Sequence, residues 1–314
     1  MAKPKSAALW HPANLLAAFG LLLLRLSALL PLTWSRSIGS GLGWLAAWAF
    51  PYRRGVALTN LKLCFPDRSP EERRRLLRHH YRAMGIGLFE LGAAWYKPDD
   101  AFPPFTRIRG LEHLDALRDA GQGALLLTAH STTLEITGRI LLAQRPFSCL
   151  YRRPNQPRIA MAMTTMRRSR MEKVIHFDEM QEMVRALRQG HLIWYAPDQG
   201  KRLKYSALVP FFGEPAVTNT ATGRIARMGR AAVLPFFGYR DSNGIYQIEI
   251  LPPLDNFPSE DDEADALRIN QLIEAYVRKA PEQYFWLHKR FKRRGPTLPE
   301  AYASSHRLGN RAAK

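Results

Sequence analysis

The most informative segment of this chain is Gly123-Ala-Leu-Leu-Leu-Thr-Ala-His130-Ser-Thr-Thr-Leu-Glu135. It begins as an apolar run typical of a buried strand, ends that run at a histidine, and adds a glutamate shortly afterwards. Chemistry in α/β proteins collects at the carboxyl ends of sheet strands. A histidine placed there can take a proton from a hydroxyl, and a nearby carboxylate can fix its tautomer and stabilise the imidazolium. The segment therefore indicates transfer of a group to an alcohol, with His130 and Glu135 as the catalytic pair.

The same segment also has a purely structural interpretation. Thr132-Thr-Leu-Glu135 fits a capping box, in which Thr132 begins a helix and Glu135 reaches back to it. This interpretation explains Glu135 without explaining His130, so both remain open.

The composition restricts the class of protein. A chain of 314 residues with 46% hydrophobic residues has room for one large domain or two modest ones. Its two cysteines, Cys64 and Cys149, argue against a disulfide scaffold and favour a reducing compartment. The spacing of Cys and His suggests no metal site, and we expect neither a metal nor a cofactor.

The strong positive charge indicates an anionic partner. The net charge is +19 and the isoelectric point lies near 10.4. A surface this positive attracts nucleic acid, anionic lipid or an acidic protein. A membrane-tethered nucleic-acid-binding protein would need a docking module, and no helix-turn-helix or aromatic RNA-binding signature is present. We therefore expect no nucleic-acid partner.

The amino-terminal region favours a membrane. Residues 12–32 are almost wholly apolar and long enough for a membrane helix, and a second apolar stretch covers residues 38–50. A cleaved signal peptide is the alternative, but no convincing cleavage site follows. We expect residues 1–50 to form a membrane anchor, as a tilted span or an interfacial helix, with Lys3, Lys5, Arg53 and Arg54 drawn to anionic headgroups on the cytoplasmic side.

The rest of the chain alternates between strand-like and helical patterns. Two helices are expected from about residue 57 to 97, the second beginning with Ser69 as its N-cap and Pro70 at its first position. Strands are expected at 124–128, 147–151, 192–196, 232–237 and 246–250, and helices at 134–144, 157–170, 179–189, 220–228 and 262–279. The alternation predicts an α/β fold whose central sheet is mostly parallel or mixed and flanked by helices. We expect a helical segment at 51–105, an α/β core at 106–298 and a basic, disordered tail at 299–314.

With these features in place, the chain resembles the bacterial lipid A late acyltransferases, part of the lysophospholipid acyltransferase superfamily. The resemblance covers nearly the whole chain. Besides His130 and Glu135, it rests on six collinear segments: Asn60-Leu-Lys-Leu-Cys-Phe-Pro66, Met84 to Trp95, Tyr151-Arg152 followed by Pro157, Trp194-Tyr-Ala-Pro-Asp-Gln199, Val209-Pro-Phe-Phe-Gly213, and Ala280-Pro-Glu-Gln-Tyr-Phe-Trp-Leu-His-Lys-Arg-Phe291.

The resemblance implies a reaction and its partners. An acyltransferase of this family moves a fatty acyl chain from acyl carrier protein to a hydroxyl of a hydroxyacyl chain on a lipid A precursor, in lipopolysaccharide biosynthesis. It works at the cytoplasmic face of the inner membrane of Gram-negative bacteria. Both the carrier protein and the precursor are anionic, which suits a charge of +19. Alternatives are an acyltransferase for another glycolipid or lysophospholipid, possibly using acyl-CoA, and a non-catalytic lipid-binding scaffold.

The resemblance also implies which residues bind substrate. Arg152 belongs to its Tyr-Arg segment, and Asp198 matches an acidic residue of functional importance, although Asp198 can instead cap the following turn. The family's R-x-R element matches Arg168-Ser-Arg170 by pattern and Arg167 by ungapped alignment, and we favour Arg168. An arginine suits a phosphate because its planar fork binds two oxygens.

The sequence departs from the family at positions near the expected site. Ser131 replaces a bulky apolar residue, Arg153 replaces a common proline, and the segment after Gln199 lacks the usual Tyr-Gly. Ser131 is not expected to act as a nucleophile, and direct transfer without an acyl-enzyme is the mechanism we predict.

Overall fold

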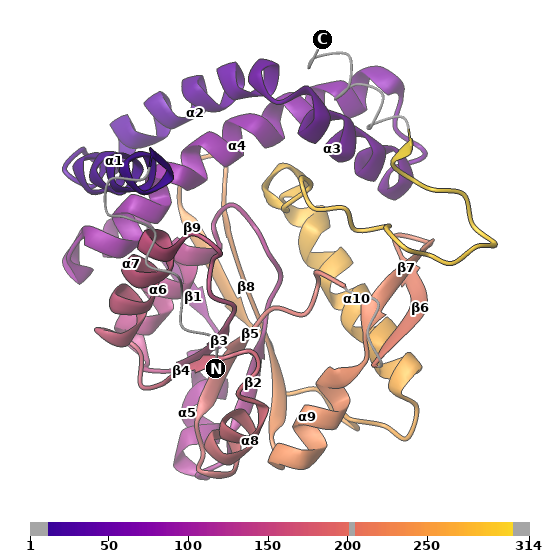
Figure 1. Cartoon of the computed structure of the whole chain (residues 1–314). Helices are drawn as coiled ribbons and strands as arrows, with labels where there is room; N and C mark the ends of the chain where they lie inside the picture. Colours follow the sequence, from indigo (N-terminus) through magenta and orange to yellow (C-terminus); the bar gives the residue numbers. More distant parts are fainter. Residues whose placement is uncertain (1–11, 201–204, 304–314) are drawn as a thin grey trace.

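A mixed β-sheet forms the centre of the protein, seen here in a computed structural model that describes residues 12–200 and 205–303. Within this part of the chain the sheet has seven strands in the order β1-β9-β8-β2-β5-β3-β4 (Figure 1). All neighbouring strands are parallel except β8 and β9, which are antiparallel. The strands are β1 (Thr106–Arg109), β2 (Ala124–Leu127), β3 (Ser148–Tyr151), β4 (Val174–His176), β5 (Leu192–Tyr195), β8 (Ala232–Arg240) and β9 (Tyr246–Ile250).

Helices cover both faces of this sheet. Successive strand residues point to opposite faces, so Leu125 and Leu127 join one apolar core while Leu126 joins the other. Helices α5 (Leu111–Asp119), α6 (Leu134–Gln144) and α7 (Pro157–Arg168) pack on the core of Leu126. Helices α8 (Met180–Arg188), α9 (Ala221–Gly229) and α10 (Asp262–Lys279) pack on the other core. The expected fold class, with a mostly parallel mixed sheet flanked by helices, is confirmed.

Four further helices lie across one end of the sheet: α1 (Pro12–Ser27), α2 (Leu32–Ala49), α3 (Pro51–Cys64) and α4 (Pro70–Tyr96) (Figure 1). Helix α4 begins as predicted, because Ser69 and Glu72 form a reciprocal capping box and Pro70 occupies the first turn. Helices α2 and α4 approach closely where Gly43 meets Gly85, since a Cβ at Gly85 would overlap the backbone of Gly43.

Of the two forms expected for the anchor, a tilted span or an interfacial helix, the span is not found. Among the described residues, no helix is both long and apolar enough to cross a bilayer. The apolar run at 12–32 is interrupted because α1 ends at Ser27, whose hydroxyl donates to the carbonyl of Leu24, and Pro31 precedes the start of α2. Proline disfavours helical backbone at the preceding residue, so the chain turns between the two helices.

Several short elements were not predicted. They are β1, β4, α5, the 3₁₀ helices η1 (Asp99–Ala101), η2 (Pro103–Phe105) and η3 (Pro281–Gln283), and a hairpin of β6 (Ser206–Phe211) and β7 (Glu214–Asn219). The hairpin turns at Phe212 and Gly213, which both have positive φ, as a tight two-residue hairpin requires. In the tail expected to be disordered, residues 304–314 lie outside the described residues.

Candidate active site

The candidate catalytic histidine lies where the sequence predicted, at the carboxyl end of a central strand. His130 follows β2. The strand β5 lies next to β2 in the sheet and runs parallel to it, and Asp198 follows β5. Parallel neighbours end at the same edge of the sheet, so the two residues meet although they are far apart in sequence.

Asp198, not Glu135, is the carboxylate that holds His130. Nδ1 of His130 donates to Oδ1 of Asp198 at 2.6 Å, and the backbone N–H of His130 donates to Oδ2 at 3.1 Å. The expectation that Glu135 would hold the imidazole is therefore wrong in this structure. Because Nδ1 is occupied, Nε2 is the nitrogen that remains for a substrate proton.

The same contacts shift the protonation equilibria of the pair. Burial disfavours the charged imidazolium of His130, but the charge and hydrogen bond of Asp198 outweigh that effect and raise the pKa of His130. Burial also works against the Asp198 carboxylate, yet its contacts with His130 lower the pKa of Asp198 overall. The aspartate therefore stays ionised and stabilises the imidazolium that would form during proton transfer.

Glu135 makes a different pair. It lies near the start of α6, and its Oε1 is 2.5 Å from Nη2 of Arg167 on α7. The Nε1 of Trp95, near the end of α4, donates to Oε2 of Glu135 at 3.4 Å. The capping box expected at this helix start is absent, because Thr133 is the N-cap and makes no side-chain capping bond. Glu135 therefore links α4, α6 and α7 instead of closing its own helix.

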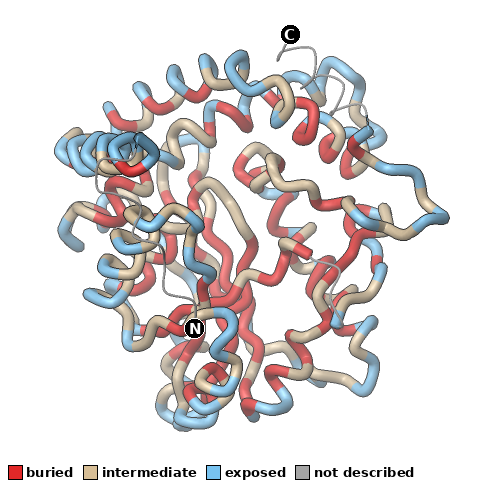
Figure 2. Tube along the Cα trace, viewed as in Figure 1, coloured by how far each residue is buried: buried red, intermediate tan, exposed pale blue. Residues whose placement is uncertain are grey.

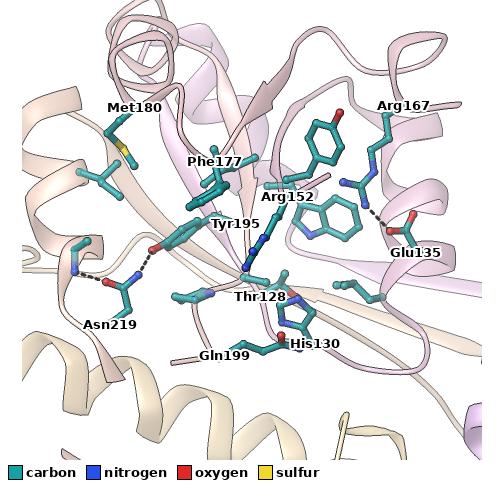
Figure 3. A pocket seen from close by; sticks show the side chains of 18 of the residues that line it. Thr128, His130, Glu135, Arg152, Arg167, Phe177, Met180, Tyr195, Gln199 and Asn219 are labelled. Carbon is teal, nitrogen blue, oxygen red and sulfur yellow. Dashed lines mark hydrogen bonds and ion pairs between the residues drawn. The ribbon is translucent and has the colours of Figure 1, made fainter. Parts of the chain in front are cut away.

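The arginine register differs from the one we favoured. Arg167 points toward Glu135 (Figure 3), and its guanidinium carbon lies 5.3 Å from the ring centre of Tyr151 and 6.0 Å from that of Trp194. Arg168 is exposed on the outer side of α7, whereas Arg170 donates to the carbonyl of Trp95 at 2.7 Å. The ungapped match at Arg167, not the pattern match at Arg168, therefore reaches the site.

A cavity of about 500 Å³ opens beside His130. Its size falls within the range of small-molecule sites, about 300–1,000 Å³. Most of the wall is apolar or aromatic, and it includes Leu134, Leu150, Met163, Phe177, Met180, Trp194 and Ile225. Glu135, Arg152 and Arg167 also line it (Figure 3). Such a wall suits a hydrocarbon chain that carries a polar group near the histidine.

Arg152 is the second arginine of this pocket. It follows β3, is exposed, and its guanidinium carbon lies 5.6 Å from the ring centre of Phe177. Unlike Arg167, it has no ion pair with a carboxylate in the described part of the chain. Its charge is therefore left for an anionic ligand.

The site also depends on Tyr284, a residue that the sequence did not single out. The hydroxyl of Tyr284 donates to Oδ2 of Asp198 at 3.1 Å, and burial raises the pKa of Tyr284, so the hydroxyl stays protonated. On either side of it, the backbone N–H of Thr132 donates to Gln283 and that of Phe285 donates to His130. The segment Ala280–Phe291 thus holds both members of the His130–Asp198 pair. The position of Tyr284 in a segment shared with the family indicated that the residue matters for function. It did not indicate a contact with Asp198.

The same carboxy-terminal segment is fixed on its other side by α3 and α4. The amide of Asn60 donates to the carbonyls of Trp286 and His288 at 2.7 and 2.8 Å, and Nδ1 of His80 donates to the carbonyl of Glu282 at 2.9 Å. Burial lowers the pKa of His80 to about 4, so it remains neutral and keeps this role at physiological pH. The segments at 60–66 and 280–291, which carry part of the family resemblance, therefore act together to position the loop of His130.

Comparison with known proteins identifies the family of this chain. The family model for the bacterial lipid A biosynthesis acyltransferase matches residues 2–293. The chain is 36% identical to the lipid A biosynthesis lauroyltransferase of Escherichia coli K12, over 95% of this chain and 98% of that protein. It is 33% identical to the palmitoleoyltransferase (90% and 93% covered) and 28% identical to the myristoyltransferase (93% and 91%) of the same organism. This chain therefore belongs to the bacterial lipid A biosynthesis acyltransferase family and is an acyltransferase.

Proposed function

We propose that this protein transfers a fatty acyl chain from the thioester of acyl carrier protein to a hydroxyl of a hydroxyacyl chain on a lipid A precursor. The observation that carries the proposal is the His130–Asp198 pair at the edge of an apolar pocket. Family membership supports the reaction class, and the relatives are named for lauroyl, palmitoleoyl and myristoyl transfer in lipid A biosynthesis.

The pair supplies the base that the reaction needs. An alcohol is almost fully protonated at neutral pH, so its attack on a thioester requires proton removal, which contributes about 10²–10⁴ in rate. Nε2 of neutral His130 accepts the hydroxyl proton as the oxygen attacks the thioester carbonyl. When the tetrahedral intermediate collapses, the C–S bond breaks and the imidazolium returns the proton to the leaving thiolate. Asp198 stabilises the imidazolium between these steps.

Direct transfer is favoured over an acyl-enzyme. Ser131 adjoins the histidine, but its hydroxyl lies 3.2 Å from that of Thr133, and Ser131 is not among the residues that line the pocket. Both cysteines are buried, and burial raises the pKa of the Cys149 thiol to about 11 and that of Cys64 well above its usual value. Neither thiol is therefore an activated nucleophile.

The two arginines of the pocket take different roles. Arg152, which has no carboxylate partner among the described residues, binds negative charge of the donor or of the oxyanion that develops on the thioester carbonyl. Arg167 is neutralised by Glu135 and orders the pocket wall formed by Tyr151 and Trp194. Asp198 is assigned to positioning His130 and not to binding substrate.

The protein approaches its lipid substrate through α1 and α2. Exposed residues recur along both helices (Figure 2). The large apolar residues among them include Leu15, Leu16, Phe19, Leu22, Leu23 and Leu26 on α1, and Trp34, Ile38, Leu42, Leu45 and Trp48 on α2. We call these residues the apolar face. An apolar surface of this extent on paired helices favours burial in the interfacial region of a bilayer. The proposed location is thus the cytoplasmic surface of the inner membrane, with the helices lying on the bilayer.

Mass spectrometry of lipid A tests the proposed reaction. Cells lacking the gene should produce lipid A that lacks one secondary acyl chain, and the wild-type gene should restore it. The His130→Ala variant should not restore it while remaining folded and at wild-type abundance. An unchanged lipid A in the deletion strain would contradict the proposed acceptor, and full restoration by His130→Ala would contradict the base.

A further inference from the structure

A second, smaller cavity adjoins the main pocket behind the Glu135–Arg167 pair. It has a volume of about 30 Å³ and lies between the end of α4, α6 and the end of α7. It shares Glu135, Arg167 and Trp194 with the main pocket. Two further arginines, Arg139 and Arg170, line only the smaller cavity, and no step of the acyl transfer uses them.

This cavity is rich in hydrogen-bond donors and poor in acceptors. The side chain of Arg139 is only 10% exposed, and its Nε has no hydrogen-bond partner within residues 12–200 and 205–303. The indole Nε1 of buried Trp194 also has none. A buried donor without an acceptor destabilises the folded state, so such groups normally meet a ligand or an ordered water.

The charges around the cavity do not cancel. The arginines Arg139, Arg167 and Arg170 carry three positive charges, while Glu135 and Asp99, which pairs with Arg139, carry two negative ones. Three positive charges against two negative ones leave a local net charge of +1. Burial and the nearby charge of Arg139 lower the pKa of Arg170, as expected where guanidinium groups crowd together. An anion placed here would satisfy the free donors and neutralise the excess charge.

The cavity lies next to the helices that carry the apolar face. Helix α1 packs against both α4 and α7, the two helices whose ends border the cavity. The guanidinium carbon of Arg25 on α1 lies 6.0 Å from the ring centre of Tyr96, which directly follows the cavity residue Trp95. With α1 resting on the bilayer, the cavity would stand close to the level of lipid headgroups, where phosphates are found.

We propose that this cavity binds a phosphate monoester of the acceptor glycolipid, held by Arg139 and Arg170. The proposal rests on the proposed function, and it assigns the smaller cavity to the acceptor headgroup and the main pocket to the acyl chain. A water needs about 10–15 Å³, so 30 Å³ holds about two oxygen-sized groups. Two of the three outer phosphate oxygens would enter, and the third and the ester oxygen would remain on the open side.

Thermal unfolding of the purified full-length protein tests binding without any acyl transfer. Inorganic phosphate should raise the Tm of the wild type more than sodium chloride at equal ionic strength, and Arg139→Gln should abolish that difference. Asp99→Asn is the matched control because it breaks the same ion pair while leaving the arginine in place. It should keep the phosphate effect or strengthen it. If Asp99→Asn abolishes the effect as completely as Arg139→Gln does, Arg139 is structural and the proposal is overturned.

Kinetics with two acceptors test the role of the phosphate in catalysis. We compare a phosphorylated glycolipid acceptor with the same acceptor after enzymatic removal of its phosphate. Arg139→Gln should raise KM for the phosphorylated acceptor by about tenfold, with little change in kcat. It should leave KM for the dephosphorylated acceptor unchanged. Arg145→Gln, which removes a half-buried charge paired with Asp115 at the C-cap of the same helix, should change neither.

A second variant and three outcomes complete the test. Arg170→Gln should also raise KM for the phosphorylated acceptor and leave KM for the dephosphorylated acceptor unchanged. If Arg139→Gln does not fold, Arg170→Gln takes its place in both experiments. If the wild type has the same KM for both acceptors and phosphate does not raise its Tm, the cavity holds only water. That result overturns the proposal and leaves the proposed acyl transfer intact. If phosphate raises the Tm of the wild type but KM is the same for both acceptors, the cavity binds free phosphate only, and the proposal is also overturned. If the protein acylates neither glycolipid, the proposed function fails. If phosphate still raises the Tm of the wild type but not that of Arg139→Gln, the anion site exists even though the proposed function is wrong.

Discussion

Oδ1 of Asp198 lies 2.6 Å from Nδ1 of His130, and this contact joins the ends of two neighbouring parallel strands. It fixes the tautomer of the histidine and raises the pKa of His130. Neutral His130 is the active form of a base, so the rate should fall as the pH drops through this raised pKa.

Replacing Asp198 tests that relationship directly. Asp198→Asn removes the charge that favours the imidazolium, so the pKa of His130 should fall and the acid limb of the kcat profile should move to lower pH. The maximal kcat should fall by at least about 100-fold, because the imidazolium loses its stabilising partner. A pH–rate profile over pH 5–9 measures both effects. An acid limb that stays in place would show that another group sets the pKa.

Tyr284 should behave as a positioning residue. Tyr284→Phe removes one donor from Asp198, which leaves the carboxylate more negative toward His130. The acid limb should therefore move to higher pH, opposite to the shift in Asp198→Asn, and kcat should fall by about tenfold with little change in KM.

Tyr246→Phe is the matched control for this prediction. The hydroxyl of Tyr246 donates at 2.8 Å to Glu90, another buried carboxylate, which lies outside the pocket. Its loss should lower the free energy of unfolding by about 1–3 kcal/mol without moving the pH profile. If both variants lose stability and neither moves the profile, Tyr284 serves the fold alone.

Much of the fold could be predicted from the sequence because its elements have clear local patterns. The expected bounds of α6 and α10 match those found, and Ser69 caps α4 as its spacing indicated. The strands β1 and β4 were missed because neither has a clear apolar run: β1 reads Thr-Arg-Ile-Arg and β4 has only three residues, whereas β2 is also short but wholly apolar.

The partner of His130 could not be predicted from local pattern. Glu135 is near in sequence, but Asp198 is near in space, since β5 lies between β2 and β3 in the sheet although it follows both in the chain. The arginine register failed for a related reason. The pattern of Arg168-Ser-Arg170 says nothing about which face of α7 meets Glu135, and packing turns Arg167 inward and Arg168 outward.

Adjacent arginines on α7 offer a test of that register. Arg167→Lys keeps the charge but loses the planar group that pairs with Glu135 and lies over Tyr151. We expect kcat/KM to fall by at least about tenfold even at low salt, because the pair is largely shielded from solvent. Arg168→Lys, on the exposed side, should match the wild type in the same initial-rate assay. The reverse result would restore the Arg168 register.

The apolar face should govern membrane binding independently of the fold. Leu16, Trp34 and Trp48 are each more than 60% exposed, so replacing them with serine removes few internal contacts and should leave the Tm unchanged. Each loses about 1.5–3 kcal/mol of apolar burial if it enters the bilayer, so the triple variant should shift from the lipid to the aqueous fraction in vesicle flotation. Leu208→Ser, on β6 and away from α1 and α2 (Figure 1), is the control and should float as the wild type does. If the triple variant still floats with the vesicles at low salt but is released at high salt, the positive charge, and not the apolar face, binds the protein to the membrane.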